Sequence, residues 1–179
     1  MSDFLLEWEG AVLLWIQNCL RGPLTDPIFL FYTQLGNAGL IWIVLSALML
    51  CFKRTRRAGV AGLLGLAVGF VLTNLTIKPL VGRVRPWLTV EGLIALVAEH
   101  DPHSFPSGHT CAAFAATCAW RPYLSKRWGN IALVCAALMG FSRLYVGVHF
   151  PTDVLAGALV GCLSVWLAWR FVRIKTKRK

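Results

Sequence analysis

The feature that most constrains the fold of this chain is a succession of long apolar segments separated by short basic clusters. Hydrophobic residues make up 57% of its 179 residues and charged residues only 15%, whereas a soluble domain carries about a quarter charged residues. Roughly 20 apolar residues suffice for a helix to cross a bilayer. We therefore expect a single domain over 1–179, an all-α integral membrane bundle with five transmembrane helices. The expected spans within a transmembrane core at 25–172 are 25–52, 58–77, 107–120, 129–148 and 151–172.

Two further segments are expected to lie on the membrane surface. Residues 4–20 are at the lower length limit for a span, and we expect an N-terminal amphipathic interfacial helix within 1–24. Its polar positions near one face are Glu7, Gly10, Gln17, Asn18 and Arg21. If this helix crosses the membrane instead, the bundle has six spans. A short interfacial helix is also expected at Val90–Val97, inside the long connection 79–105.

The basic residues favour one orientation in the membrane. Thirteen of the 18 Lys and Arg residues fall in three clusters, at 53–57, 121–127 and 170–179, which the five-span arrangement puts on one side. Cytoplasmic loops are enriched in such residues. We therefore expect an integral membrane protein with a cytoplasmic basic tail at 173–179. Because the clusters flank apolar segments, they indicate membrane lipids as partners and argue against nucleic-acid binding.

Three polar motifs interrupt the apolar sequence, all on the expected exterior or periplasmic side. The first is KPLVGRVRP, in which Lys78 and Arg85 offer positive charge to the oxygens of a phosphate group and Pro86 stiffens the turn. Single cations at such positions also snorkel to lipid headgroups. Arg83 lies between them. It could reach the second phosphate of a diphosphate, or equally be a surface charge that faces headgroups.

The second motif, Pro106-Ser107-Gly108-His109, opens an expected helix. Ser107 is a suitable N-cap, and Gly108 leaves the backbone open to close approach. The free amides and the dipole of a helix N-terminus attract anions. The motif therefore predicts either part of a phosphate site or an ordinary cap followed by a solvent-facing histidine.

The third motif is SRLYVGVHFPTD, from Ser142 to Asp153. Arg143 adds another cation, and His149 precedes Asp153 by four residues. A carboxylate that accepts a proton from one imidazole nitrogen fixes the tautomer and leaves the other nitrogen free to attack. The alternative is that Asp153 only caps the helix that follows.

Taken in order, these residues resemble the type-2 phosphatidic acid phosphatase superfamily. The pattern is K-x6-RP, then PSGH, then SR-x5-H-x3-D, and each defined position is met between Lys78 and Asp153. The resemblance implies a membrane phosphatase, expected in a bacterial plasma membrane, that needs no metal and no cofactor. It implies that His149 is the nucleophile that forms a phosphohistidine, that Asp153 orients it, and that His109 is the general acid and then the base.

The resemblance also implies which residues hold the phosphate and which support them. Those that hold it would be Lys78, Arg85, Ser107, Gly108 and Arg143, and those that support the site would be Pro86, Pro106, Ser142 and Arg83. A second interpretation of the connection is a metal site, because four O or N donors fall within five residues. These are Glu99, His100, Asp101 and His103.

The expected substrate is a lipid phosphate or diphosphate. We favour undecaprenyl diphosphate, because the chain is short, its site is expected to face outward and Arg83 is available. Phosphatidylglycerol phosphate and phosphatidate are the closest alternatives. A lipid phosphotransferase and a non-catalytic lipid-binding membrane protein remain as further hypotheses. The sequence makes no prediction of the oligomeric state.

Overall fold

The protein is described by a computed structural model that covers residues 3–176. Within this range all regular structure is helical, and the only strand-like feature is an isolated antiparallel pair, Val84 with His103. The α-helices are α1 (Asp3–Leu20), α2 (Thr25–Leu35), α3 (Leu40–Leu50), α4 (Arg56–Phe70), α5 (Lys78–Val81), α6 (Gly108–Trp120), α7 (Lys126–Tyr145) and α8 (Pro151–Thr176). Short 3-10 helices occupy η1 (Asn37–Gly39), η3 (Pro86–Leu88) and η4 (Arg121–Tyr123), and η2 (Val71–Ile77) is a π-helix.

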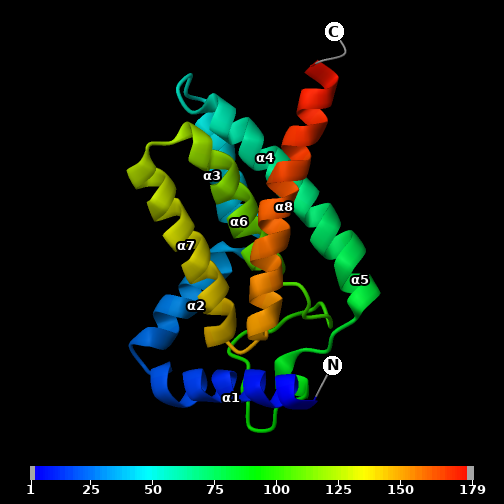
Figure 1. Cartoon of the computed structure of the whole chain (residues 1–179). Coiled ribbons are helices and arrows are strands. Elements are labelled where there is room, and N and C mark those ends of the chain that lie inside the picture. The colour runs from blue at the N-terminus through cyan, green and yellow to red at the C-terminus, as the bar shows by residue number, and fades with distance from the viewer. Residues whose placement is uncertain (1–2, 177–179) are drawn as a thin grey trace.

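Helices α4, α6, α7 and α8 run lengthwise through the bundle, and α1 lies across one end (Figure 1). Small residues let α8 approach α6 closely. A Cβ atom at Gly157 would lie 2.5 Å from the carbonyl oxygen of Ser107, and one at Gly161 would lie 2.6 Å from that of Cys111. This approach places the start of α8 directly against the start of α6, the two helix ends that carry the second and third sequence motifs.

The core between α3, α4, α6 and α7 combines alanines with two tryptophans. Ala113 and Ala116 are fully buried beside Trp42, Trp120 and Met139. The indole nitrogen of Trp120 donates a hydrogen bond to Ser46, 3.2 Å away. Small side chains on α6 thus let its neighbours pack closely around it, as in other membrane bundles.

The predicted spans agree only in part with the observed helices. Arg56–Val81 and Pro151–Arg170 are long and apolar enough to cross a membrane. The predicted span 25–52 is instead a broken pair, α2 and then η1 with α3, bent by 51°. The break falls at the glycine-containing segment Gly36–Gly39, where Ala38 and Gly39 have φ of 51° and 70°. By length and composition the described residues thus hold two spanning helices, or three if the bent pair counts as one. The full set of five is not established.

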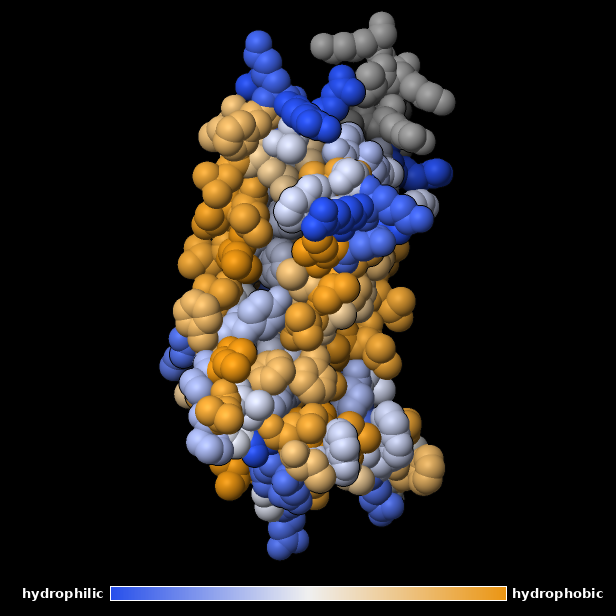
Figure 2. Space-filling model, turned by 90° about the vertical axis from the view of Figure 1, so that its left-hand side faces the viewer, coloured by the Kyte–Doolittle hydropathy of each residue, from blue (hydrophilic) through white to orange (hydrophobic). Residues whose placement is uncertain are grey.

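The surface supports a membrane setting. Figure 2 shows a broad hydrophobic belt between hydrophilic side chains gathered at the two ends of the molecule. Large apolar side chains on several helices are more than half exposed, including Phe31, Phe70, Leu159 and Trp166. A soluble protein rarely exposes so much contiguous apolar surface, so this belt is expected to face lipid.

Helix α1 holds the connection that follows α5. Gln17 donates to the carbonyl oxygen of Gly92 and accepts from the amide of Ile94, at 3.0 and 2.9 Å. Arg21 donates to the carbonyl oxygen of Ile94 at 2.6 Å. The prediction of a helix at Val90–Val97 is therefore wrong. This segment is a turn followed by an irregular stretch whose backbone groups bond to α1 and to the end of α7, and Gly92 has φ of 78°.

Candidate active site

The three motifs meet around one cavity of about 550 Å³. Lys78 comes from α5, Arg85 from the connection, His109 from α6 and His149 from the turn between α7 and α8. The cavity extends from these polar residues to an apolar region on α3 and α4. That region is lined by Ile43, Leu63, Leu66, Ala67 and Phe70. One cavity thus joins a cationic, histidine-bearing end to an apolar end.

The imidazole of His149 has a defined tautomer. Nη1 of Arg85 lies 3.1 Å from Nε2 of His149, and the same group donates to the carbonyl oxygen of Val148 at 3.0 Å. A guanidinium can only donate hydrogen bonds. Nε2 therefore accepts and carries a lone pair, and the ring proton is on Nδ1. His149 is 2% exposed, and burial together with the charges of Arg85, Arg143 and Lys78 holds its pKa well below the usual range. The ring is neutral near pH 7.

Asp153 faces the protonated side of that ring. Its Oδ2 lies 3.4 Å from Nδ1 of His149 and accepts the amide of Phe150 at 2.9 Å. Within the described part of the chain Nδ1 has no closer hydrogen-bond partner. Catalytic hydrogen bonds commonly tighten when substrate binds. The structure therefore places the carboxylate where it can orient His149 and also bond to the turn before α8.

The second motif caps α6 and presents His109 to the cavity. Oγ of Ser107 accepts from the amide of Thr110 at 3.4 Å, and the amide of Ser107 donates to the carbonyl oxygen of Asp153 at 2.9 Å. Nε2 of His109 lies 3.0 Å from Oδ1 of Asn37 in the break between α2 and α3. Gly108 also lines the cavity. His109 lines the cavity as well, which agrees with the first of the two sequence interpretations, and the role of this motif in holding phosphate stays a prediction.

Two carboxylates of the connection pair with Lys78 and Arg85, which line the cavity, and with Arg143, which is buried and is not among the lining residues. Glu99 pairs with Arg143 and lies 3.5 Å from Arg85, while Asp101 pairs with Lys78. Thr33 accepts a further bond from Arg143 at 2.5 Å. Burial acts to raise the pKa of Asp101, but the bonds from Lys78 and from the amide of His103 outweigh it and lower that pKa.

These contacts bear on the predicted metal cluster. Glu99 and Asp101 point to arginine and lysine side chains. Among residues 3–176 no three His, Cys, Asp or Glu side chains gather as metal ligands would. The sequence spacing of Glu99, His100, Asp101 and His103 was misleading, because an extended connection does not bring neighbouring side chains to one point.

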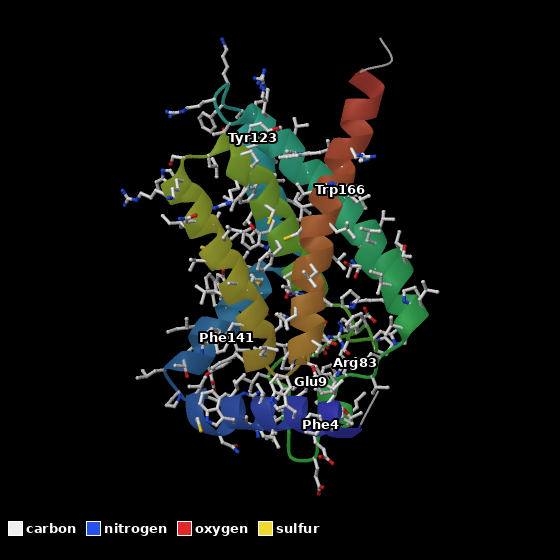
Figure 3. All side chains as sticks on the ribbon, viewed as in Figure 1. Phe4, Glu9, Arg83, Tyr123, Phe141 and Trp166 are labelled. Atoms are coloured by element: carbon white, nitrogen blue, oxygen red, sulfur yellow. The ribbon has the colours of Figure 1, made fainter. Side chains whose placement is uncertain are left out.

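Arg83 differs from both sequence interpretations. It donates to Oδ1 of Asp153 at 2.6 Å and to Oε2 of Glu9 at 2.5 Å, and its side chain is only 9% exposed. Figure 3 shows Arg83 and Glu9 side by side beneath α8. The guanidinium is therefore committed to two carboxylates and is neither a headgroup-facing surface charge nor free to bind a second phosphate.

The remaining motif residues have supporting positions. Pro86 begins η3, and Pro106 precedes the cap of α6. Ser142 is fully buried in α7, where its hydroxyl donates to the carbonyl oxygen of Met139 at 2.7 Å. A hydroxyl bonded within its own helix supports the packing of α7.

Comparison with known proteins connects this geometry to a family. The family model of the PAP2 superfamily matches residues 58–177, about two thirds of the chain. The chain belongs to the PAP2 superfamily. An undecaprenyl-diphosphatase of Sulfolobus acidocaldarius is 34% identical over 151 residues, which are 83% of this chain and 70% of that protein.

Two solved structures of PAP2-like proteins are similar throughout. The crystal structure of Aquifex aeolicus LpxE superimposes with a TM-score of 0.79 at 27% identity, and covers 94% of this chain and 96% of that one. The transmembrane PAP2-type phosphatidylglycerolphosphate phosphatase of Bacillus subtilis gives a TM-score of 0.77 at 31% identity, with 96% and 88% covered. The PAP2 fold thus includes nearly the whole chain, α1 among it.

Three contacts of this PAP2 site were missed from the sequence. Neither Glu9 nor Asn37 was among the predicted site residues, and Glu99 was considered as a metal ligand. The contact of Asn37 could have been anticipated, because it is a polar residue within an apolar segment, and an amide in a membrane helix needs a hydrogen-bond partner. For Glu9 and Glu99 the sequence holds no comparable signal, since both lie among residues expected at a wet surface.

Proposed function

We propose that this PAP2 protein is a lipid phosphatase that works through a phosphohistidine on His149, without a metal or other cofactor. One observation carries the proposal. His149, whose Nε2 carries a lone pair, lines the same cavity as His109 and the buried cations Lys78 and Arg85. Such a site combines a nucleophile, a proton donor and positive charge for the phosphoryl oxygens, which phosphoryl transfer requires.

In the first step Nε2 of His149 attacks the terminal phosphorus and forms an N–P bond. The bond from that terminal phosphorus to the bridging oxygen, which stays with the lipid product, breaks, and protonated His109 gives its proton to this leaving oxygen. The imidazole, bonded at Nε2 and protonated at Nδ1, then carries a positive charge that Asp153 faces. Lys78, Arg85 and Arg143, with the backbone amides of the first turn of α6, stabilise the charge on the phosphoryl oxygens.

In the second step water replaces the histidine. His109, now neutral, accepts a proton from the water as its oxygen bonds to phosphorus. The N–P bond breaks, its electron pair returns to Nε2 of His149, and inorganic phosphate leaves. Both residues regain their starting protonation states, so the cycle balances without a redox partner.

The apolar end of the cavity supports a lipid substrate. Ile43, Leu66 and Phe70 offer a surface for hydrocarbon next to the cationic end. Undecaprenyl diphosphate is our favoured substrate, supported by the relative at 34% identity that bears that activity in its name. Because Arg83 is paired with Glu9 and Asp153, it is not available for a second phosphate, and this argument for a diphosphate substrate no longer holds. Phosphatidylglycerol phosphate is the principal alternative, suggested by the Bacillus subtilis structure.

We further propose the membrane arrangement expected from the sequence. The active site faces the exterior or periplasm, α1 lies at that surface, and the basic tail 173–179, whose last three residues lie outside the described range, is cytoplasmic. The position of α1 across the end of the bundle (Figure 1) and the hydrophobic belt (Figure 2) support this arrangement. A five-span topology requires that α6 and α7 cross beside the more apolar helices.

The test is phosphate release by the detergent-purified protein in the presence of a chelator. Undecaprenyl diphosphate, phosphatidylglycerol phosphate and phosphatidate are compared, with the variant His149→Ala beside the wild type. We expect release from the diphosphate above all, and none from the variant. Activity retained in His149→Ala would overturn the nucleophile, and release that needs added magnesium or zinc would overturn metal independence. Label passed to an added lipid instead of water would favour the transferase.

A further inference from the structure

Glu9 lies on the N-terminal helix, outside every motif, and is one of the most enclosed charges of the molecule. Its side chain is completely buried. A buried carboxylate is costly unless it is hydrogen-bonded and paired. Glu9 meets this condition in full. Oε2 accepts from Arg83 at 2.5 Å, and Oε1 accepts from the amide and the hydroxyl of Thr152 at 2.9 and 2.6 Å.

Through Arg83, Glu9 is connected to the carboxylate that faces His149. Nη2 of Arg83 bonds Glu9, while Nη1 bonds Oδ1 of Asp153 at 2.6 Å. The planar guanidinium also lies over the ring of Phe150, with 3.9 Å from its central carbon to the ring centre. A planar guanidinium that is hydrogen-bonded through both Nη1 and Nη2 has little freedom to rotate.

The bond from Arg83 determines which oxygen of Asp153 can face His149. Oδ1 is taken by Arg83, so Oδ2 is left for the amide of Phe150 and for Nδ1 of His149, at 2.9 and 3.4 Å. We infer that Glu9 is a positioning residue of the phosphatase reaction, acting through Arg83 on Asp153 and so on His149. The inference rests on the proposed function.

The charges lead to the same assignment. Two carboxylates and one guanidinium leave one net negative charge beside an imidazole whose positive neighbours are Lys78, Arg85 and Arg143. The carboxylates of Glu99 and Asp101 pair with these three cations, and neither is bonded to the ring. When Nε2 bonds to phosphorus, the ring becomes positive and this net charge stabilises it. Without the charge of Glu9 the group is neutral, and Arg83 is drawn onto Asp153 alone. The positive ring that forms in the transition state then loses stabilisation, whereas the bound substrate, beside a neutral ring, does not.

The experiment compares Glu9→Gln with Glu7→Gln, which removes an exposed carboxylate from the same helix. Steady-state kinetics are measured on the best substrate, with thermal unfolding of each protein. We expect Glu9→Gln to lower kcat roughly tenfold, as coupled neighbours commonly do, with KM nearly unchanged. The acid limb of kcat/KM, which follows His149, is expected to move to lower pH because a negative charge is lost. Glu7→Gln should match the wild type.

A second variant keeps the inference testable if Glu9→Gln does not fold. Glu9→Asp retains the charge but shortens the reach to Arg83, and its kcat should lie between those of Glu9→Gln and the wild type. In an Arg83→Gln background, Glu9→Gln should change kcat little further, since the connection is already broken.

Two kinds of result would overturn the inference. A Glu9→Gln variant with wild-type kcat and only a lower unfolding temperature would reduce Glu9 to a structural role, as would independent effects of Glu9→Gln and Arg83→Gln. Wild-type protein without phosphatase activity, or with activity that survives His149→Ala, would instead overturn the proposed function and this inference together. The two failures are therefore distinguishable.

Discussion

Asn37 and His109 meet across the break in the first long apolar segment, with Oδ1 of the amide 3.0 Å from Nε2 of the ring. An amide oxygen only accepts hydrogen bonds, so Nε2 of His109 carries a proton. The unusual backbone of the break, with φ of 51° at the adjacent Ala38, thus brings a polar side chain to the proposed general acid. Backbone conformations of this kind tend to gather at functional sites.

We predict that Asn37→Ala lowers kcat roughly tenfold, because a general acid contributes fully only when it is held towards the leaving oxygen. The measurement is steady-state phosphate release, with Asn18→Ala, an exposed asparagine of α1, as the control. A variant with wild-type kcat and a raised KM would show that Asn37 binds substrate and does not position His109.

We predict that Glu99→Gln strengthens inhibition by inorganic phosphate. Glu99 pairs with Arg143 and Arg85, the cations proposed to hold the phosphoryl oxygens, so an anion must compete with it. A neutral amide can still accept from Arg143 but leaves the positive charge free, and the inhibition constant should fall by about tenfold. The control is Glu91→Gln, an exposed acid of the same connection. An unchanged inhibition constant would mean that Glu99 moves away before phosphate binds.

The sequence was more informative about the residues that line the cavity than about the residues that contact and position them. Lys78, Arg85, His109 and His149 were identified because their spacing is tied to a mechanism, and the structure brings all four to one cavity. The contacts made by Glu9, Asn37 and Glu99 depend on how α1, the break and the connection fold back on the bundle. Local spacing says nothing of contacts between residues more than 40 positions apart.

The helix boundaries differ for a related reason. Apolar periodicity found the segments, but it placed a helix at 90–97, where backbone groups bond instead to α1 and α7. It also ended the second span at 77, whereas the helix continues through a π-turn to Val81. At 90–97 it is therefore partners distant in sequence that decide the local structure.

The pH dependence follows from the lowered pKa of His149, which burial causes first and the nearby Arg85, Arg143 and Lys78 increase. Attack needs the neutral ring. Since its pKa lies well below 6.5, the ring stays neutral as the pH falls through that value, and the acid limb of kcat/KM should appear only at lower pH. Lys78→Met removes one positive neighbour and should move this limb to higher pH, besides weakening binding. A wild-type limb at or above pH 6.5 would contradict the assignment.

The close approach of α8 to α6 gives the last prediction. A methyl group at Gly157 would lie 2.5 Å from the carbonyl oxygen of Ser107, so Gly157→Ala must push apart the two helices that carry Asp153 and His109. Overpacking of this kind costs about 1–3 kcal/mol, and we expect a lower unfolding temperature together with reduced kcat. The control is Gly22→Ala, where the nearest atom to a new methyl group is 3.9 Å away. Equal unfolding temperatures for the two variants would show that α8 can shift without loss, and unchanged kcat would show that the site does not depend on this contact.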